Sequence, residues 1–243
     1  MRTLNYGLIS GLLTSSLLLT GCGDGEVFLT PGTTSATTNP GVISQKNFSI
    51  LADTPSPTVI DTTTGTFTQT DVKLTVYTGD RNNQTVTDAH TITFMSEYGL
   101  INPPTCTTDS TGTCSVTWSA ISRPVAGGPG SDYRVTITAY TSGEEAFTDS
   151  NGNGVFDDGD AGFDDIEEPY IDADKTNSAS ASSYSSGDTI IDVVSTNDPT
   201  GANGQHDIAD GFFNGNGCTH TSLCAARKTI TIWDDIVLYI DGT

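Results

Sequence analysis

Basic residues are scarce in this sequence. It has 9 Lys and Arg against 30 Asp and Glu in 243 residues, which gives a formal net charge of −21 at pH 7. Nucleic acid phosphates and anionic lipid headgroups repel so acidic a chain, whereas divalent cations are attracted to it. The composition therefore argues against a nucleic-acid partner and favours a metal ion.

Catalytic motifs are absent as well. No G-x-S-x-G nucleophile motif occurs, and His90, His206 and His220 fall at an expected strand start, in a Gly- and Asn-rich stretch and between two cysteines. Paired carboxylates for glycoside hydrolysis exist in the acidic part of the chain, but a cluster neutralised by cations explains them with fewer assumptions. We therefore expect a protein that is not an enzyme.

Long apolar runs are missing except at the N-terminus. Arg2 is followed by an apolar run from Leu8 to Leu19 and then by small residues before Cys22. This pattern is typical of a secretory signal and is too short and too poorly flanked for a membrane span. We expect residues 1–21 to be a signal peptide. Its removal also removes Arg2, which leaves 30 acidic and 8 basic side chains and a formal charge of −22.

The end of this signal, Leu19-Thr20-Gly21-Cys22, resembles the lipobox of bacterial lipoprotein precursors. The resemblance implies that the chain is cut before Cys22 and that this cysteine carries a lipid. Gly23 stands where an Asp would favour retention at the inner membrane, so the resemblance implies an anchor in the outer membrane, on its periplasmic face or at the cell surface. The alternative is an ordinary signal peptide followed by a cysteine that forms a disulfide.

The other four cysteines lie in two local pairs. Cys106 and Cys114 flank a turn-rich stretch, and Cys218 and Cys224 are the ends of CTHTSLC. Two local disulfides are expected in an oxidising compartment. A zinc site made of Cys218, His220 and Cys224 is the alternative, although it lacks a fourth ligand and the usual spacing.

Short segments of alternating apolar residues indicate strands. They are NFSILAD, DVKLTVYTG, HTITFMSEYG, CSVTWSA, YRVTITAY and TITIWDDIVLYI, and turn residues separate them. In the second segment Val72, Leu74 and Val76 share one face, and YRVTITAY alternates in the same way, as in half-buried strands. No stretch after the signal has a helical period. The predicted fold is all-β, an antiparallel β-sandwich with Trp118 and Trp233 in its core.

The segments around these strands have a different composition. Residues 22–46 are rich in Thr, Gly and Pro, and we expect them to be the lipidated cysteine and a flexible tether. The strands lie in residues 47–145 and 226–243. Between them, residues 146–225, the acidic segment, are rich in Asp, Ser, Gly and Asn. So long a connection is unusual in a compact sandwich and is either functional or disordered.

Three motifs resemble a known family. TITFMSEYGLI, TCTTDSTGTCSVTW and YRVTITAYTSGEEAFTDSNGNGVFDDGD occur in this order, and the chain resembles bacterial Ig-like domains of the Big-1 type, the modules of invasin- and intimin-like surface proteins. It resembles more closely the single-domain Ig-like surface lipoproteins with an acidic insertion before the last strand. The resemblance implies an Ig-like sandwich with a role in binding or as a spacer, because the family contains adhesins and stalks.

Residues 149–160, DSNGNGVFDDGD, match the calcium-binding loop of the EF-hand, with Gly154 at its sharp turn. The expected ligands are oxygen atoms of Asp149, Asn151, Asn153, Val155, Asp157 and Asp160. The last ligand is Asp instead of Glu, two ligands are neutral, and no helices are expected beside the loop. These differences predict weak calcium binding, with a Kd of roughly 10⁻⁴ to 10⁻³ M.

A solvated acidic loop that binds nothing is the alternative. Residues 144–174 contain 12 of the 30 acidic residues and no Lys or Arg, so this stretch repels itself without cations. The same stretch contains apolar side chains that we expect to pack once cations collapse it: Phe147, Phe156, Phe163, Tyr170 and Ile171. A second candidate metal site consists of Asp164, Glu167, Glu168, Asp172 and Asp174. No regular spacing supports a further site from Asp192, Asn203, Asp207 and Asp210.

The sequence thus predicts a lipid-anchored, non-catalytic binding or adhesion module, whose acidic segment is ordered by calcium and whose partner is a protein or a glycan at the cell surface. The alternative is a structural spacer or a subunit of a surface assembly, in which calcium only stabilises the fold.

Overall fold

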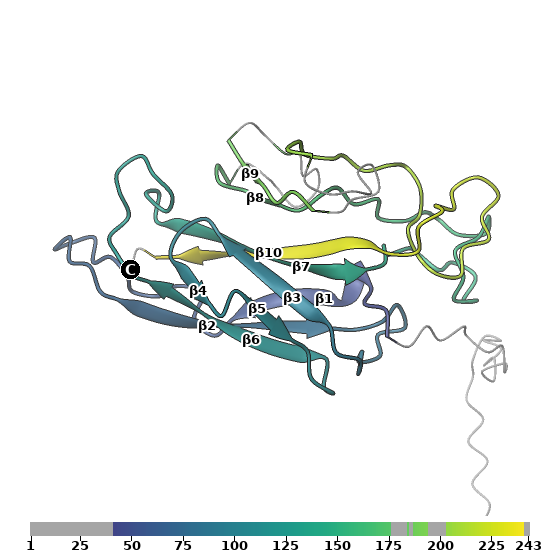
Figure 1. Cartoon of the computed structure of the whole chain (residues 1–243), viewed down its shortest axis with the longest axis horizontal. Helices are drawn as coiled ribbons and strands as arrows, with labels where there is room; N and C mark the ends of the chain where they lie inside the picture. The colour runs from purple at the N-terminus through teal and green to yellow at the C-terminus, as the bar shows by residue number, and fades with distance from the viewer. Residues whose placement is uncertain (1–40, 176–183, 185–186, 194–202, 241–243) are drawn as a thin grey trace, which may run out of the picture. The chain divides into compact units, whose positions relative to one another are not determined.

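The computed structural model describes residues 41–175, 184, 187–193 and 203–240 (Figure 1). The expected signal peptide, Cys22 and most of the expected tether lie outside the described residues, and their assignments stay predictions. In the part of the chain that is described, no helix is long and apolar enough to cross a membrane.

The described residues form two antiparallel sheets of four strands each, with the orders β1-β2-β6-β4 and β10-β7-β3-β5. Their strands are β1 (Phe48–Ala52), β2 (Thr70–Thr78), β3 (Thr91–Ser96), β4 (Leu100–Asn102), β5 (Thr105–Thr107), β6 (Thr113–Ala120), β7 (Arg134–Gly143) and β10 (Ile230–Tyr239). A short 3-10 helix, η1 (Gln45–Asn47), precedes β1, and β8 (Tyr170–Ile171) pairs with β9 (Thr189–Ile190). Each of the six predicted strands is present. The other four have only two or three residues each, too few for an alternating pattern to be recognised.

The two sheets share one hydrophobic core. Val72, Leu74 and Val76 on β2 are fully buried in it, because alternate side chains of a strand point to the same face. Trp118 on β6 is also fully buried, as predicted, and its indole nitrogen donates to the carbonyl oxygen of Tyr98 at 2.7 Å. Burying one large apolar side chain contributes about 1.5–3 kcal/mol. This all-β arrangement is consistent with the predicted sandwich.

Covalent and polar contacts join the two sheets. The disulfide Cys106–Cys114, one of the two predicted pairs, connects β5 in one sheet to β6 in the other. On the other side, the amide of Gln45 donates to the carbonyl of Trp233 at 2.8 Å, and the N–H of Ile50 donates to the carboxylate of Asp234 at 3.0 Å. These contacts fix β10 against the start of β1.

Strand β7 is buried on both faces, so the expectation of a half-buried strand was wrong. Thr136 and Thr138, on the face away from the core, are 0% exposed. Their hydroxyls donate to the carbonyl oxygens of Asp172 (2.7 Å) and Tyr170 (3.0 Å). The acidic segment therefore covers the outer face of this sheet, where β8 lies beside β7 and β10 (Figure 1). The sequence pattern cannot distinguish a Thr that faces water from one that faces another segment's backbone.

Trp233 lies outside the sandwich core, contrary to expectation. It is half-buried on the outer face of β10, where its indole nitrogen donates to the carbonyl of Glu167 at 3.0 Å and its ring packs edge-on against Tyr170. Trp233 thus anchors the acidic segment to the sheet.

Candidate metal-binding site

Aromatic side chains form a small second core inside the acidic segment. Phe156 and Phe213 are almost fully buried, with ring centroids 4.8 Å apart, and Phe147 and Phe163 pack against both of them. His220 stacks on Phe156 at 5.2 Å. The phenylalanines pack together as predicted, whereas the role of cations in this packing stays a prediction. The packing supports the 149–160 loop from one side, because Phe156 belongs to that loop.

The 149–160 loop is closed by hydrogen bonds to its first and last carboxylates. Asp149 accepts the N–H groups of Gly152 (2.7 Å) and Gly154 (2.8 Å). Asp160 accepts those of Ser150 and Asp157, both at 2.9 Å. Gly154 has a φ of +73°, a left-handed conformation that favours glycine, so the residue placed at the sharp turn has the conformation that the template requires.

Asp157 is the meeting point of the other side chains of the loop. The amides of Asn151 and Asn153 donate to its carboxylate at 3.0 and 2.7 Å, and the N–H of Gly159 donates at 2.7 Å. The bond from Gly159, followed by that from Asn153, lowers the pKa of Asp157 below its ordinary value. The carboxylate is therefore ionised at neutral pH, as a cation ligand must be. Val155 donates its N–H to the side-chain oxygen of Asn153 at 2.7 Å.

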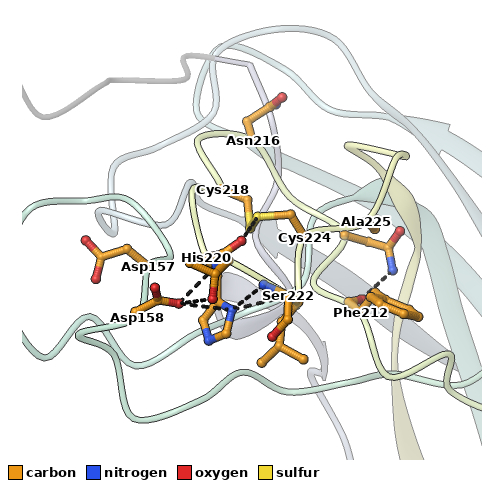
Figure 2. The surroundings of a disulfide bond; sticks show 12 residues. Asp157, Asp158, Phe212, Asn216, Cys218, His220, Ser222, Cys224 and Ala225 are labelled. Carbon is orange, nitrogen blue, oxygen red and sulfur yellow. Dashed lines mark hydrogen bonds and ion pairs between the residues drawn. A yellow bond between two sulfur atoms is a disulfide. The ribbon is translucent and has the colours of Figure 1, made fainter.

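A disulfide-closed loop supports the same residues from another direction (Figure 2). The carboxylate of Asp158 accepts the N–H and the hydroxyl of Thr221, at 3.0 and 3.1 Å, and Thr219 donates its N–H to the carbonyl of Phe156 at 2.8 Å. The disulfide Cys218–Cys224 is the second predicted pair. Because it leaves no thiolate on either cysteine, the alternative zinc site is excluded.

His220 lies inside this disulfide-closed loop. Its Nδ1 accepts the N–H groups of Ser222 and Leu223, both at 3.2 Å. The carboxylate of Asp158 lies 3.3 Å from the same nitrogen, and Figure 2 shows it facing the ring.

Arg81, which follows β2, is a structural residue that sequence reasoning missed. Its guanidinium forms a bidentate pair with Glu144, and both side chains are nearly buried. It also donates to the carbonyl oxygens of Gly154 (3.1 Å) and Asn216 (2.7 Å). The guanidinium of Arg81 thus connects the sandwich to the 149–160 loop and to the stretch before Cys218. No local motif could have indicated these contacts, since Arg81 and Asn216 are 135 residues apart.

The second candidate site is only partly assembled. Ligand atoms of Asp172, Asp174 and Asp188 lie within 4.8 Å of one another, and Asp188 was not among the predicted residues. In the described part of the chain this is the one such group of His, Cys, Asp or Glu. The remaining predicted members, Asp164, Glu167 and Glu168, are not part of this group.

Glu168 has a different role. It is 3% exposed, and its carboxylate accepts the N–H groups of Val193 (2.5 Å) and Asp207 (3.2 Å). Burial is the main cause that raises the pKa of Glu168 above its ordinary value. Glu167 lies where the acidic segment meets Trp233, and Asp164 is exposed, with its N–H donating to the carbonyl of Ala146 at 2.8 Å.

Comparison with known proteins gives no relative for this arrangement. The sandwich and the loop therefore have to be interpreted from their own geometry, and the Big-1 resemblance stays a prediction. No protein-family model, no curated protein and no solved structure matches the chain.

Proposed function

We propose that this chain is a lipid-anchored, non-catalytic binding module of the bacterial outer membrane, with an Ig-like sandwich of the Big-1 type and an acidic segment ordered by calcium. The observation that supports it best is the 149–160 loop, where Asn151 and Asn153 meet the carboxylate of Asp157 and where Asp149 and Asp160 each accept two backbone N–H groups of the loop. Calcium prefers six to eight oxygen ligands, and a loop of alternating ligands with a glycine turn supplies them.

The chemistry of the loop favours a hard cation. Its ligand side chains are carboxylates and amides, without His or Cys, which are the usual ligands of softer metals. The amides of Asn151 and Asn153 now donate to Asp157, so a cation in the loop takes the place of these donors and binds the amide oxygens instead.

The loop lies where an ordered surface can recognise a partner. Aromatic packing, the disulfide loop and Arg81 hold it against a rigid sheet, and loops positioned by a rigid scaffold commonly carry binding functions. The partner class that we propose is a protein or a glycan at the cell surface. The acidic surface makes nucleic acid an unfavourable partner.

A calcium titration of the purified full chain by calorimetry, after removal of metal with chelator, tests the proposal. We expect wild type to bind with a Kd of about 10⁻³ M or tighter, and Asp149→Ala with Asp160→Ala to abolish that binding event. A matched control is Asp61→Ala with Asp109→Ala, because both of these carboxylates also accept backbone N–H groups in exposed turns. Equal calcium binding by the loop variant and wild type contradicts the proposal.

The structural alternative, a spacer or assembly subunit in which calcium only stabilises, has its own support. The acidic segment covers β7 and contacts Arg81, so ordering the segment also stabilises the sandwich. Glycan and protein arrays probed with calcium separate the two functions. Calcium-dependent capture of a ligand by monomer favours the binding module, whereas self-association without capture favours the spacer.

A further inference from the structure

Glu145 joins two distant parts of the acidic segment to the end of β7. One oxygen of its carboxyl group accepts the N–H of Ile166 at 3.0 Å, and the other accepts the N–H of Asn214 at 2.7 Å. Its own N–H donates to the carbonyl oxygen of Asn214 at 3.0 Å. Ile166 and Asn214 follow Glu145 by 21 and 69 residues, so a single residue holds both parts to the sandwich.

No basic side chain neutralises the carboxyl group of Glu145. The residue is 1% exposed, and no Lys, Arg or His of the described residues forms an ion pair with it. Burial is the main cause that raises the pKa of Glu145 from 4.5 to about 7, and repulsion from Asp165 and Asp210 adds to it. A buried carboxylate is costly unless a proton or another cation neutralises it.

The geometry favours a proton over a metal ion. The carboxylates of Glu145, Asp165 and Asp210 are not among the described groups whose ligand atoms lie within 4.8 Å of one another, so they are too far apart to enclose one ion. A proton needs only one carboxyl group. Its binding therefore requires no convergence of ligands.

The surroundings of Glu145 also contain more hydrogen-bond acceptors than donors. Oδ1 of Asn214, whose side chain is fully buried, has no hydrogen-bond partner, and neither has the buried Oδ1 of Asp165, which precedes Ile166. A carboxylate only accepts hydrogen bonds, whereas a protonated carboxyl group also donates one. Protonation of Glu145 thus adds a donor to a region where buried oxygens lack one.

We propose that Glu145 is a proton-sensitive clamp on the acidic segment. Its protonated side chain holds the parts around Ile166 and Asn214 against the end of β7 more firmly than its charged form does. Mildly acidic surroundings therefore tighten the acidic segment. This clamp does not require calcium in the 149–160 loop.

The direction of the pH effect follows from the two states of the carboxyl group. When the segment opens, the pKa of Glu145 returns from about 7 to its ordinary value of 4.5. The closed segment therefore binds more protons between these two values. The stability that Glu145 contributes is fully present below pH 4.5 and is lost as the pH rises through about 7.

Hydrogen exchange of the full chain in chelator tests the clamp. After correction for the intrinsic exchange rate, protection of the N–H groups of Ile166 and Asn214 should increase roughly tenfold from about pH 8 to about pH 6. Glu145→Gln imitates the protonated side chain and should reduce this increase to less than about twofold. Glu144→Gln is the matched control. Glu144 is equally buried but is paired with Arg81, so this variant should keep the wild-type increase.

The same pH-dependent increase in protection in wild type and in Glu145→Gln would overturn the proposal. Carbon-13 NMR of the glutamate carboxyl groups provides a second test that needs no variant. One of these groups should titrate near pH 7, well above the ordinary value of 4.5. Midpoints below about pH 5.5 for every glutamate would contradict the clamp, because Glu145 would then stay charged at neutral pH.

Discussion

At the scale of single residues, two neighbouring buried glutamates differ in whether a basic side chain neutralises their charge. Glu144 and Glu145 are each 1% exposed at the end of β7. Glu144 is paired with Arg81, whereas no Lys, Arg or His in the described part of the chain forms an ion pair with Glu145. Side chains of consecutive residues in an extended chain point in opposite directions, so the two carboxylates reach different surroundings.

Arg81→Met is expected to destabilise the protein by about 3–5 kcal/mol, because it leaves Glu144 buried without its cation. Urea denaturation measures this change in the free energy of unfolding. Arg134→Met is the matched control, since its pair with Asp132 is 39% exposed on both sides and should contribute less than about 1 kcal/mol. Similar losses for the two variants would show that Arg81 does not have the structural role described above.

At the scale of elements, two loops that are distant in the sequence stabilise each other. The loop closed by Cys218–Cys224 bonds to Phe156 and Asp158, and both of these residues belong to the 149–160 loop. A site that is already ordered binds its ion without a further entropic cost of ordering. Opening the disulfide should therefore affect calcium binding, although neither cysteine touches the ion in the proposed site.

Cys218→Ser with Cys224→Ser is expected to weaken calcium binding by roughly fivefold, because ordering even one additional residue costs about 1 kcal/mol. Calorimetric titration of the full chain measures the effect. Cys106→Ser with Cys114→Ser serves as the control, since that disulfide joins β5 to β6 and should lower the melting temperature without changing calcium affinity. Unchanged affinity in the first variant would mean that the two loops are energetically independent.

At the scale of the whole molecule, a net charge of −21 makes the stability depend on the ions in solution. Any salt screens the repulsion between exposed carboxylates, but only an ion that binds the folded state adds a specific contribution. In chelated protein, about 10 mM calcium chloride at a Kd of about 10⁻⁴ M should stabilise by about 2.7 kcal/mol.

That stabilisation corresponds to a rise in melting temperature of roughly 5–10 °C for a chain of this size. Sodium chloride at the same ionic strength, about 30 mM, should produce a clearly smaller rise, because it acts by screening alone. Thermal unfolding followed by circular dichroism makes the comparison. Equal rises in melting temperature in the two salts would mean that screening accounts for the whole effect.

Local patterns were sufficient to predict much of this protein. Alternating apolar residues specify six strands, because a strand buries every second side chain, and short cysteine spacings specify both disulfides. The loop at 149–160 was also visible, because its candidate ligands are all local in the sequence. Only the tertiary structure decided the long-range contacts: the burial of Thr136 and Thr138, the position of Trp233, the pair of Arg81 with Glu144, and the meeting of Glu145 with Asn214. These contacts join residues 32 to 69 positions apart, and no periodicity in a sequence records which distant segments come together when the chain buries its polar groups.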